Sequence, residues 1–243
     1  MSKAKNLKKK KQGLKKKVLS LSFLISIPLA ALLTAFNIYN IVIYHFKFTA
    51  DPLAWSTFGL GFIASISILE GVKLSWFRTF IHELKHAIVI LCTGNRIKNF
   101  HVEKHTGHVE FYIQKDKLHF KPLIMVSPYF LPLFSAPVFI ACLIFDASFS
   151  VPLWLILGAT LAADLDMGFR EIHPHQTDIS NMFGGIILVG LFIVSMKLMW
   201  CSFCLLWVTG GWESLQTTGA TAWGFLSAIA EGVASILEAR KNS

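Results

Sequence analysis

Two histidines and a glutamate in one short stretch, His82-Glu83-Leu84-Lys85-His86, have the types and spacing that metal-assisted hydrolysis needs. On a helix, side chains four positions apart lie on one face, so His82 and His86 can bind one cation. Glu83 then stands where it can accept a proton from a water molecule on that cation. An apolar run, residues 87–91, follows directly, and ionisable groups beside lipid-like sequence are costly and usually mark function. The stretch therefore predicts half of a zinc site.

A catalytic zinc needs a third protein ligand, because such sites hold three protein ligands and leave one position open. The densest polar segment after residue 121 spans residues 164–178. We expect Asp178 to be the ligand, since it stands immediately before a long apolar stretch, where a helix N-terminus favours a carboxylate. The same position suits a helix N-cap, and the two roles are compatible. A charged Asp164 would lie deep in an apolar run and need a partner such as Lys197. The alternative ligands are Asp164, His173 and His175.

The composition is that of an integral membrane protein. Hydrophobic residues make up 54% of the 243 residues and charged residues only 15%, with a mean hydropathy of +0.57. Nine of the 23 basic residues precede Val18, which leaves 14 basic against 14 acidic residues in the remainder. This polybasic tail predicts a cytoplasmic N-terminus that binds anionic lipid. We expect no nucleic-acid partner, because aromatic residues do not interleave with these lysines. We expect the membrane to be a bacterial inner membrane.

Apolar stretches of spanning length predict an all-α polytopic membrane protein with about five to six transmembrane helices and a small β-hairpin insertion. These stretches lie at residues 19–46, 53–72, 76–93, 123–145, 151–166 and 179–208. The fourth is interrupted by Pro122, Pro128, Pro132 and Pro137. We expect it to kink or split near Pro128 and Pro137, since proline breaks helical hydrogen bonding.

Residues 96–114 alternate between apolar and polar around Thr106-Gly107, a pattern typical of a β-hairpin. The hairpin is either connecting structure or an edge strand that aligns an extended substrate. Residues 219–239 have scattered apolar positions with Glu231 and Glu238 opposite, which predicts an interfacial or packing helix. The chain thus divides into a polybasic tail (1–17), a membrane-embedded domain (18–208) and a C-terminal amphipathic helix or tail (209–243).

Four features occur in this order along the chain. They are H-E-L-K-H at the start of an apolar helix, the hairpin after it, the proline-broken segment with Ser127-Pro128-Tyr129-Phe130-Leu131-Pro132, and Gln176-Thr177-Asp178 before another helix. In this combination residues 76–208 resemble a divergent branch of the site-2 protease family of intramembrane zinc metallopeptidases. Members typically carry an aspartate ligand in a Leu-Asp-Gly motif, which here would be Thr177-Asp178-Ile179. The resemblance implies one zinc per chain on His82, His86 and Asp178, with Glu83 as the general base.

These observations favour a membrane-embedded zinc endopeptidase that uses metal-activated water to cleave a membrane-tethered protein. One alternative is a non-catalytic relative that acts as a membrane scaffold or regulator. Another is a small ion-coupled transporter that uses the polar cluster as an ion path. The intact Glu83 favours the enzyme, because a binding module has no need of a general base.

Overall fold

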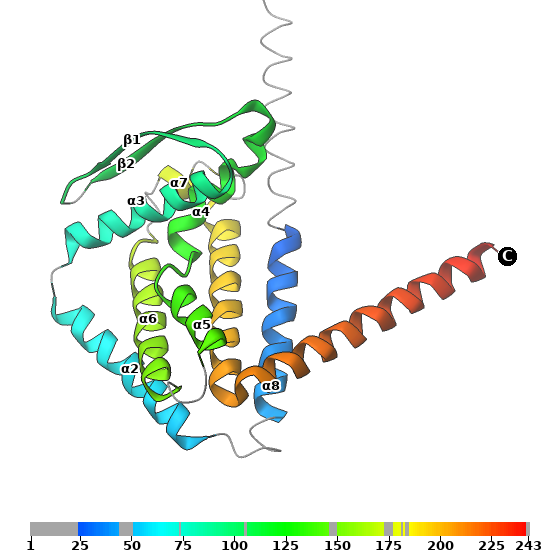
Figure 1. Cartoon of the computed structure of the whole chain (residues 1–243). Coiled ribbons are helices and arrows are strands. Elements are labelled where there is room, and N and C mark those ends of the chain that lie inside the picture. The colour runs from blue at the N-terminus through cyan, green and yellow to red at the C-terminus, as the bar shows by residue number, and fades with distance from the viewer. Residues whose placement is uncertain are drawn as a thin grey trace, which may run out of the picture.

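The computed structural model describes residues 24–43, 51–72, 74–104, 106–145, 150–172, 177–180, 182 and 185–241. In these residues the protein is a helical bundle with one small antiparallel sheet, which confirms the predicted fold class (Figure 1). The predicted polybasic tail and the candidates His173 and His175 lie outside the described residues.

The elements are as follows. An N-terminal helix, Leu24–Ile43, is followed by α2 (Pro52–Gly71) and α3 (Ser75–Cys92). The hairpin consists of β1 (Arg96–Val102) and β2 (Gly107–Tyr112), and a short 3-10 helix, η1 (Lys115–Phe120), leads out of it. The remaining helices are α4 (Lys121–Phe130), α5 (Ser135–Ile144), α6 (Ser150–Arg170), α7 (Thr177–Ser180) and α8 (Gly185–Lys241).

Within the described residues, four helices are long and apolar enough to cross a membrane: Leu24–Ile43, Pro52–Gly71, Ser150–Arg170 and Ile186–Phe225. A fifth span results if α4 with η1 and α5, which meet at an angle of 83°, are counted as one broken span. The bend falls at Leu131–Phe134, between two of the prolines that predicted a break. The count therefore agrees with the lower end of the expected five to six.

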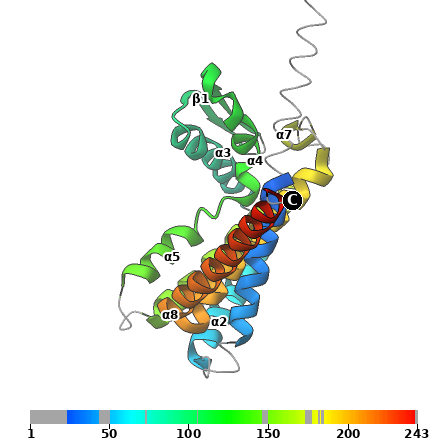
Figure 2. The same ribbon diagram turned by 90° about the vertical axis from the view of Figure 1, so that its right-hand side faces the viewer.

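The predicted span at 76–93 needs correction. These residues form α3, but α3 is not among the candidate spans, because it carries Arg78, Glu83 and Lys85. The helix lies across one end of the bundle, beneath the hairpin (Figures 1 and 2). Its charged residues thus sit where the bundle meets its polar cap, and the cost of placing them in lipid is avoided.

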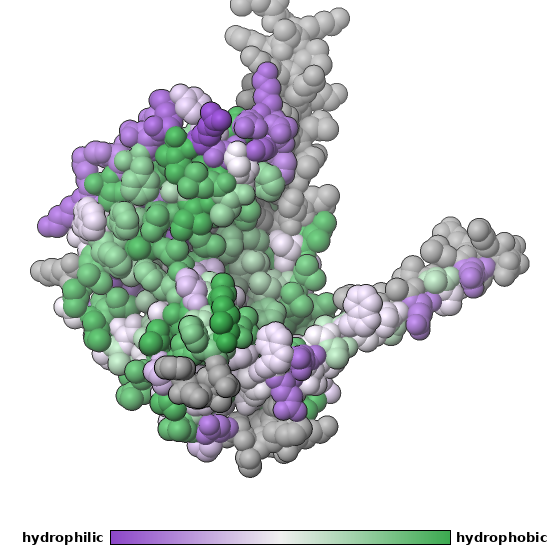
Figure 3. Space-filling model, in the orientation of Figure 1, coloured by the Kyte–Doolittle hydropathy of each residue, from purple (hydrophilic) through white to green (hydrophobic). Residues whose placement is uncertain are grey.

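The surface of the bundle is apolar below the hairpin. Figure 3 shows a broad hydrophobic band, with hydrophilic residues gathered over the hairpin end. Ile63 of α2 is 66% exposed and Ile187 of α8 is 75% exposed. Apolar side chains exposed over such an area would be unfavourable in water, whereas lipid tails solvate them well.

Two glycines let α2 and α6 pack backbone to backbone. A Cβ atom on Gly61 would collide with the carbonyl group of Leu155, and one on Gly158 would collide with that of Phe58. Close approach through small residues is a common way for membrane helices to associate. Around this contact, buried side chains of α2, α5, α6 and α8 form the main core. They are Ala54, Phe58, Phe139, Cys142, Leu157, Leu161, Cys204 and Val208.

The hairpin docks through its apolar face. Val109 and Phe111 of β2 pack, with Ile97 of β1, against a cluster that includes Ile90 of α3 and Ile124 of α4. The strands pair antiparallel, with a register shift between Ile97 and Asn99. The alternation in the sequence thus gives one buried face, and that face fixes the hairpin over α3 and α4.

The long C-terminal helix differs from its prediction at its start. We expected an apolar helix from residue 179, whereas α8 begins at Gly185 and Asp178 lies in the separate four-residue helix α7. Further on, α8 bends at Gly210 and Gly211, and its last segment leaves the bundle (Figure 1).

Candidate metal centre

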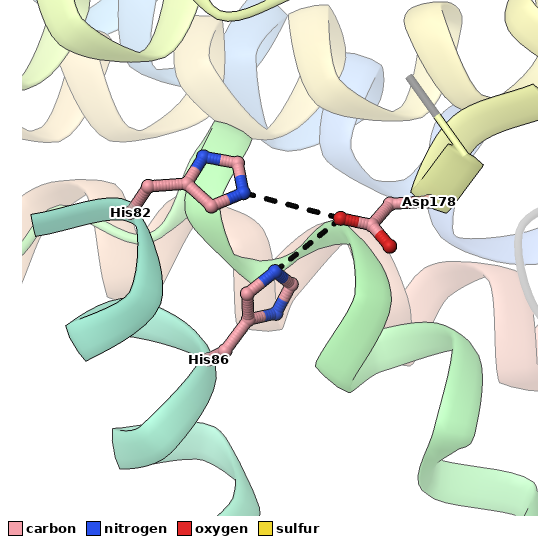
Figure 4. A group of neighbouring side chains, drawn as sticks. All are labelled: His82, His86 and Asp178. Carbon is pink, nitrogen blue, oxygen red and sulfur yellow. Dashed lines mark ion pairs between the residues drawn. The ribbon is translucent and has the colours of Figure 1, made fainter. Parts of the chain in front are cut away.

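The α3 helix presents His82, Glu83 and His86 to the protein interior. Glu83 is 5% exposed and His86 is 9% exposed. Because residues four apart are one turn along the helix, both imidazoles project from the same face, towards α4 and α7 (Figure 4). The two rings lie edge to face with their centroids 5.0 Å apart. The local spacing in the sequence therefore produces the expected pair of neighbouring imidazoles.

Asp178 reaches the same point from α7. The neighbouring Ile179 is 1% exposed and packs with Val126 and Tyr129 of α4 and Val189 of α8, which anchors the short helix. The Asp178 Oδ2 atom lies 3.4 Å from His86 Nε2 and 3.9 Å from His82 Nε2 (Figure 4). Asp178 is thus brought to the two histidines from nearly one hundred residues along the chain.

Hydrogen bonds fix the orientation of both imidazoles. His82 Nδ1 lies 2.8 Å from the Glu171 carboxylate, and His86 Nδ1 lies 2.7 Å from the carbonyl oxygen of Ile124. Both partners are acceptors, so each Nδ1 carries the proton and donates it. In the neutral imidazoles each Nε2 then keeps a free lone pair, and both face Asp178. Metal-binding histidines are commonly held in this way.

The separation of these atoms suits a small tetrahedral cation. Zinc with ligand bonds near 2.0–2.2 Å places its ligand atoms about 3.4 Å apart. One edge of the group, at 3.4 Å, matches that value, and another, at 3.9 Å, is slightly wider. The three residues together offer ligand atoms within 4.8 Å of one another. Two imidazoles and one carboxylate form a set that zinc accepts, so these residues fit the metal.

Without a cation, the group balances its own charges. Burial raises the pKa of Asp178, but its contacts with His82 and His86 lower this pKa by more, so the carboxyl stays ionised. Burial lowers the pKa of His82, but Asp178 and Glu171 outweigh this and raise it to about 9. A cation that binds here replaces the proton on His82 as the partner of Asp178.

Glu83 lies directly beneath the hairpin. A Cβ atom on Gly107, the first residue of β2, would come within 2.6 Å of Glu83 Cγ and 2.9 Å of its Oε1. Only a residue without a side chain fits there without displacing the carboxylate. Burial raises the pKa of Glu83 by more than the nearby histidines lower it, which makes this side chain a better proton acceptor than an exposed glutamate.

The remaining candidates lie elsewhere. The Asp164 carboxylate accepts hydrogen bonds from the backbone N–H groups of Phe134 and Ser135, at the start of α5, and does not join the histidines. Its expected partner Lys197 donates to the Asp164 backbone carbonyl instead, and Lys85 Nζ lies 3.8 Å from the carboxylate. His108 is exposed on β2.

Three contributions were missing from the sequence-based site. Glu171 was part of the polar segment, but no spacing rule connected it to His82. Tyr129 is fully buried and packs its ring edge to face on His82, with the centroids 5.5 Å apart. Gly107 was predicted only as a turn residue, although a glycine in a hairpin also permits close contact with its backbone.

A cavity of about 600 Å³ opens beside the cluster. It lies along β2, η1 and the start of α4, and Asp178 forms part of its wall. Apolar side chains, two lysines and Glu110 line the rest. They include Val109, Phe111, Leu118, Lys121 and Met125. The cavity therefore runs from β2 to the metal-ligand group.

A family model described as Peptidase M50B-like matches residues 60–212, which include the candidate ligands, the hairpin and the broken helix pair. No curated protein and no solved structure matches the chain significantly.

Proposed function

The chain belongs to the Peptidase M50B-like family of site-2 proteases, and from that premise we propose that it is a membrane-embedded zinc endopeptidase that hydrolyses peptide bonds of membrane-tethered proteins. The observation that carries the proposal is the convergence of His82, His86 and Asp178, with Glu83 on the same helix. Family membership alone supports a membrane protease, and the donor set supports zinc as its metal.

His82, His86 and Asp178 would hold one zinc ion per chain. When bound, zinc supplies a Lewis acid that polarises a carbonyl group and lowers the pKa of water towards about 7. Glu83 accepts a proton from the attacking water on its carboxylate and returns it to the leaving amine. Glu171 and the Ile124 carbonyl keep the two imidazoles in position while the proton moves.

A membrane helix must unwind before its peptide bonds reach the site, because its backbone groups are hydrogen-bonded within the helix. The cavity beside β2 can receive such an extended segment, and the edge of β2 that pairs with no strand among the described residues can hydrogen-bond its backbone. We therefore propose that β2 aligns the substrate and delivers it to Asp178. We further propose a bacterial inner membrane as the location, with a cytoplasmic N-terminal tail that binds anionic lipid.

The proposal is tested with the full chain in proteoliposomes together with a panel of single-span reporter proteins. We expect new N-termini within or next to the reporter spans, detected by mass spectrometry. Removal of metal with 1,10-phenanthroline should stop cleavage, and added zinc should restore it. Cleavage that continues in protein shown by elemental analysis to be metal-free would contradict the mechanism.

Replacement of Gly107 should separate catalysis from metal binding. In Gly107→Ala the new methyl group must displace Glu83 or lift the hairpin, at a cost of about 1–3 kcal/mol. We expect cleavage to slow by about tenfold or more, since about 1.4 kcal/mol corresponds to a factor of ten. Zinc content should stay at the wild-type value. The matched control is Thr106→Ala on the same turn, and equal rates for both variants would show that the contact with Glu83 has no catalytic importance.

A further inference from the structure

We propose that Pro128 is a positioning residue for the metal centre, because it frees the backbone carbonyl that holds His86. Pro128 lies inside α4, where residue 128 would normally donate its N–H to the carbonyl four positions earlier. That carbonyl belongs to Ile124, and proline has no N–H to donate. It is the same oxygen that lies 2.7 Å from His86 Nδ1.

Both acceptor positions on the Ile124 oxygen are in use. One accepts the Ser127 hydroxyl at 2.7 Å, and the other accepts His86 Nδ1–H. A carbonyl oxygen has two lone pairs, so an amide N–H at position 128 would have to compete with His86. The proline ring also pushes against the carbonyl four residues earlier, which tilts it out of the helix. Both effects direct the oxygen towards α3.

Further bonds hold α4 and α3 in this register. The Ser127 hydroxyl shares its one proton between the Ile124 carbonyl at 2.7 Å and the Lys85 carbonyl at 3.3 Å, and Lys85 Nζ donates to the Pro128 carbonyl at 3.3 Å. Ile124, Ser127 and Lys85 are each no more than 2% exposed, so these bonds form out of contact with solvent. These bonds connect the turn of α4 that contains Pro128 to the turn of α3 that carries His86. They therefore keep the Ile124 carbonyl next to the His86 imidazole.

The consequence concerns the tautomer of His86. With Nδ1–H bound to Ile124, Nε2 is the nitrogen that faces Asp178 and that a cation can bind. Without that acceptor, the ring is free to carry its proton on Nε2 or to turn. The position of Pro128 thus prepares the ligand before any metal arrives. This inference rests on the proposed zinc site for its purpose, but the tautomer itself is a property of the protein alone.

The experiment compares Pro128→Ala with Pro122→Ala, which changes a proline in the first turn of the same helix, where the missing N–H leaves no carbonyl free. In metal-free protein, nitrogen NMR of labelled histidine should show His86 protonated at Nδ1 in wild type and Pro122→Ala. Pro128→Ala should show a mixture or the Nε2–H form. Zinc competition should give an affinity about 10–100-fold weaker for Pro128→Ala only, the usual effect of losing such a partner.

The melting temperature and amide exchange at position 128 accompany these measurements. A folded Pro128→Ala protein with a protected amide at 128, the wild-type tautomer and wild-type zinc affinity would overturn the proposal. If Pro128→Ala does not fold, Pro128→Gly, which also introduces an N–H, takes its place under the same criteria. Wild type in the Nε2–H form would overturn it as well. A wild type that has the Nδ1–H form but binds no zinc would instead count against the proposed function and leave the tautomer assignment standing.

Discussion

In Glu83→Gln we expect cleavage to fall by about 10²–10⁴-fold, the usual contribution of a general base. Glutamine keeps the size of the side chain and its fit beneath Gly107, but it cannot accept a proton from water. The measurement is the rate of reporter cleavage in proteoliposomes, with zinc content determined on the same preparation. Zinc should remain near one per chain, because Glu83 is not among the three converging ligand atoms.

The matched control is Glu70→Gln, which alters an exposed glutamate near the end of α2. It should cleave at the wild-type rate. Wild-type turnover in Glu83→Gln would rule out the assigned base. If wild type itself binds zinc without cleaving any reporter, the scaffold alternative gains support, and zinc- or proton-coupled flux that survives Glu83→Gln would favour the transporter.

The parts of the site that the sequence predicted are those governed by local spacing. His82 and His86 are one helical turn apart, and any helix through these residues brings their side chains together. The hairpin was equally local, since its alternation and its Thr-Gly turn lie within twenty residues. These predictions needed no knowledge of tertiary structure.

The prediction that α3 spans the membrane was wrong for a related reason. Mean hydropathy averages over all sides of a helix, so the apolar residues 87–91 outweighed Arg78, Glu83 and Lys85 when the span was predicted. The structure buries Glu83 beneath the hairpin and Lys85 against α4, so protein covers the charged side chains on both sides of α3. A helix whose polar residues are covered in this way can lie across the end of a bundle as well as through it.

The partners of the imidazoles could not be predicted. Every residue has a backbone carbonyl, so the sequence does not single out that of Ile124. Whether this carbonyl can accept a hydrogen bond from His86 depends on a proline four positions later and on the packing of α3 on α4. Glu171 meets His82 only because α6 ends beside α3. Asp164 was a plausible ligand until its carboxylate was seen at the start of α5, where two backbone N–H groups stabilise its charge.

Removal of a metal ligand should give the largest change in zinc content. We expect about one zinc per chain in detergent-purified wild type, and almost none in His86→Ala or Asp178→Ala. A site of three protein ligands that loses one of them is weakened by more than the about 10–100-fold caused by losing an outer partner. Elemental analysis measures the metal, and circular dichroism with a melting curve confirms that each variant is folded.

The matched controls are His119→Ala and Asp116→Ala, two exposed residues of η1 that should leave zinc unchanged. Zinc that is lost from His86→Ala but retained in Asp178→Ala would contradict the assigned third ligand and move it to His173 or His175. Asp164 is the weaker replacement, because its carboxylate already binds the start of α5, and removing it would destabilise the fold before it affected the metal. The ratio of zinc retained in Asp178→Ala to that in Asp116→Ala therefore decides whether α7 completes the metal centre.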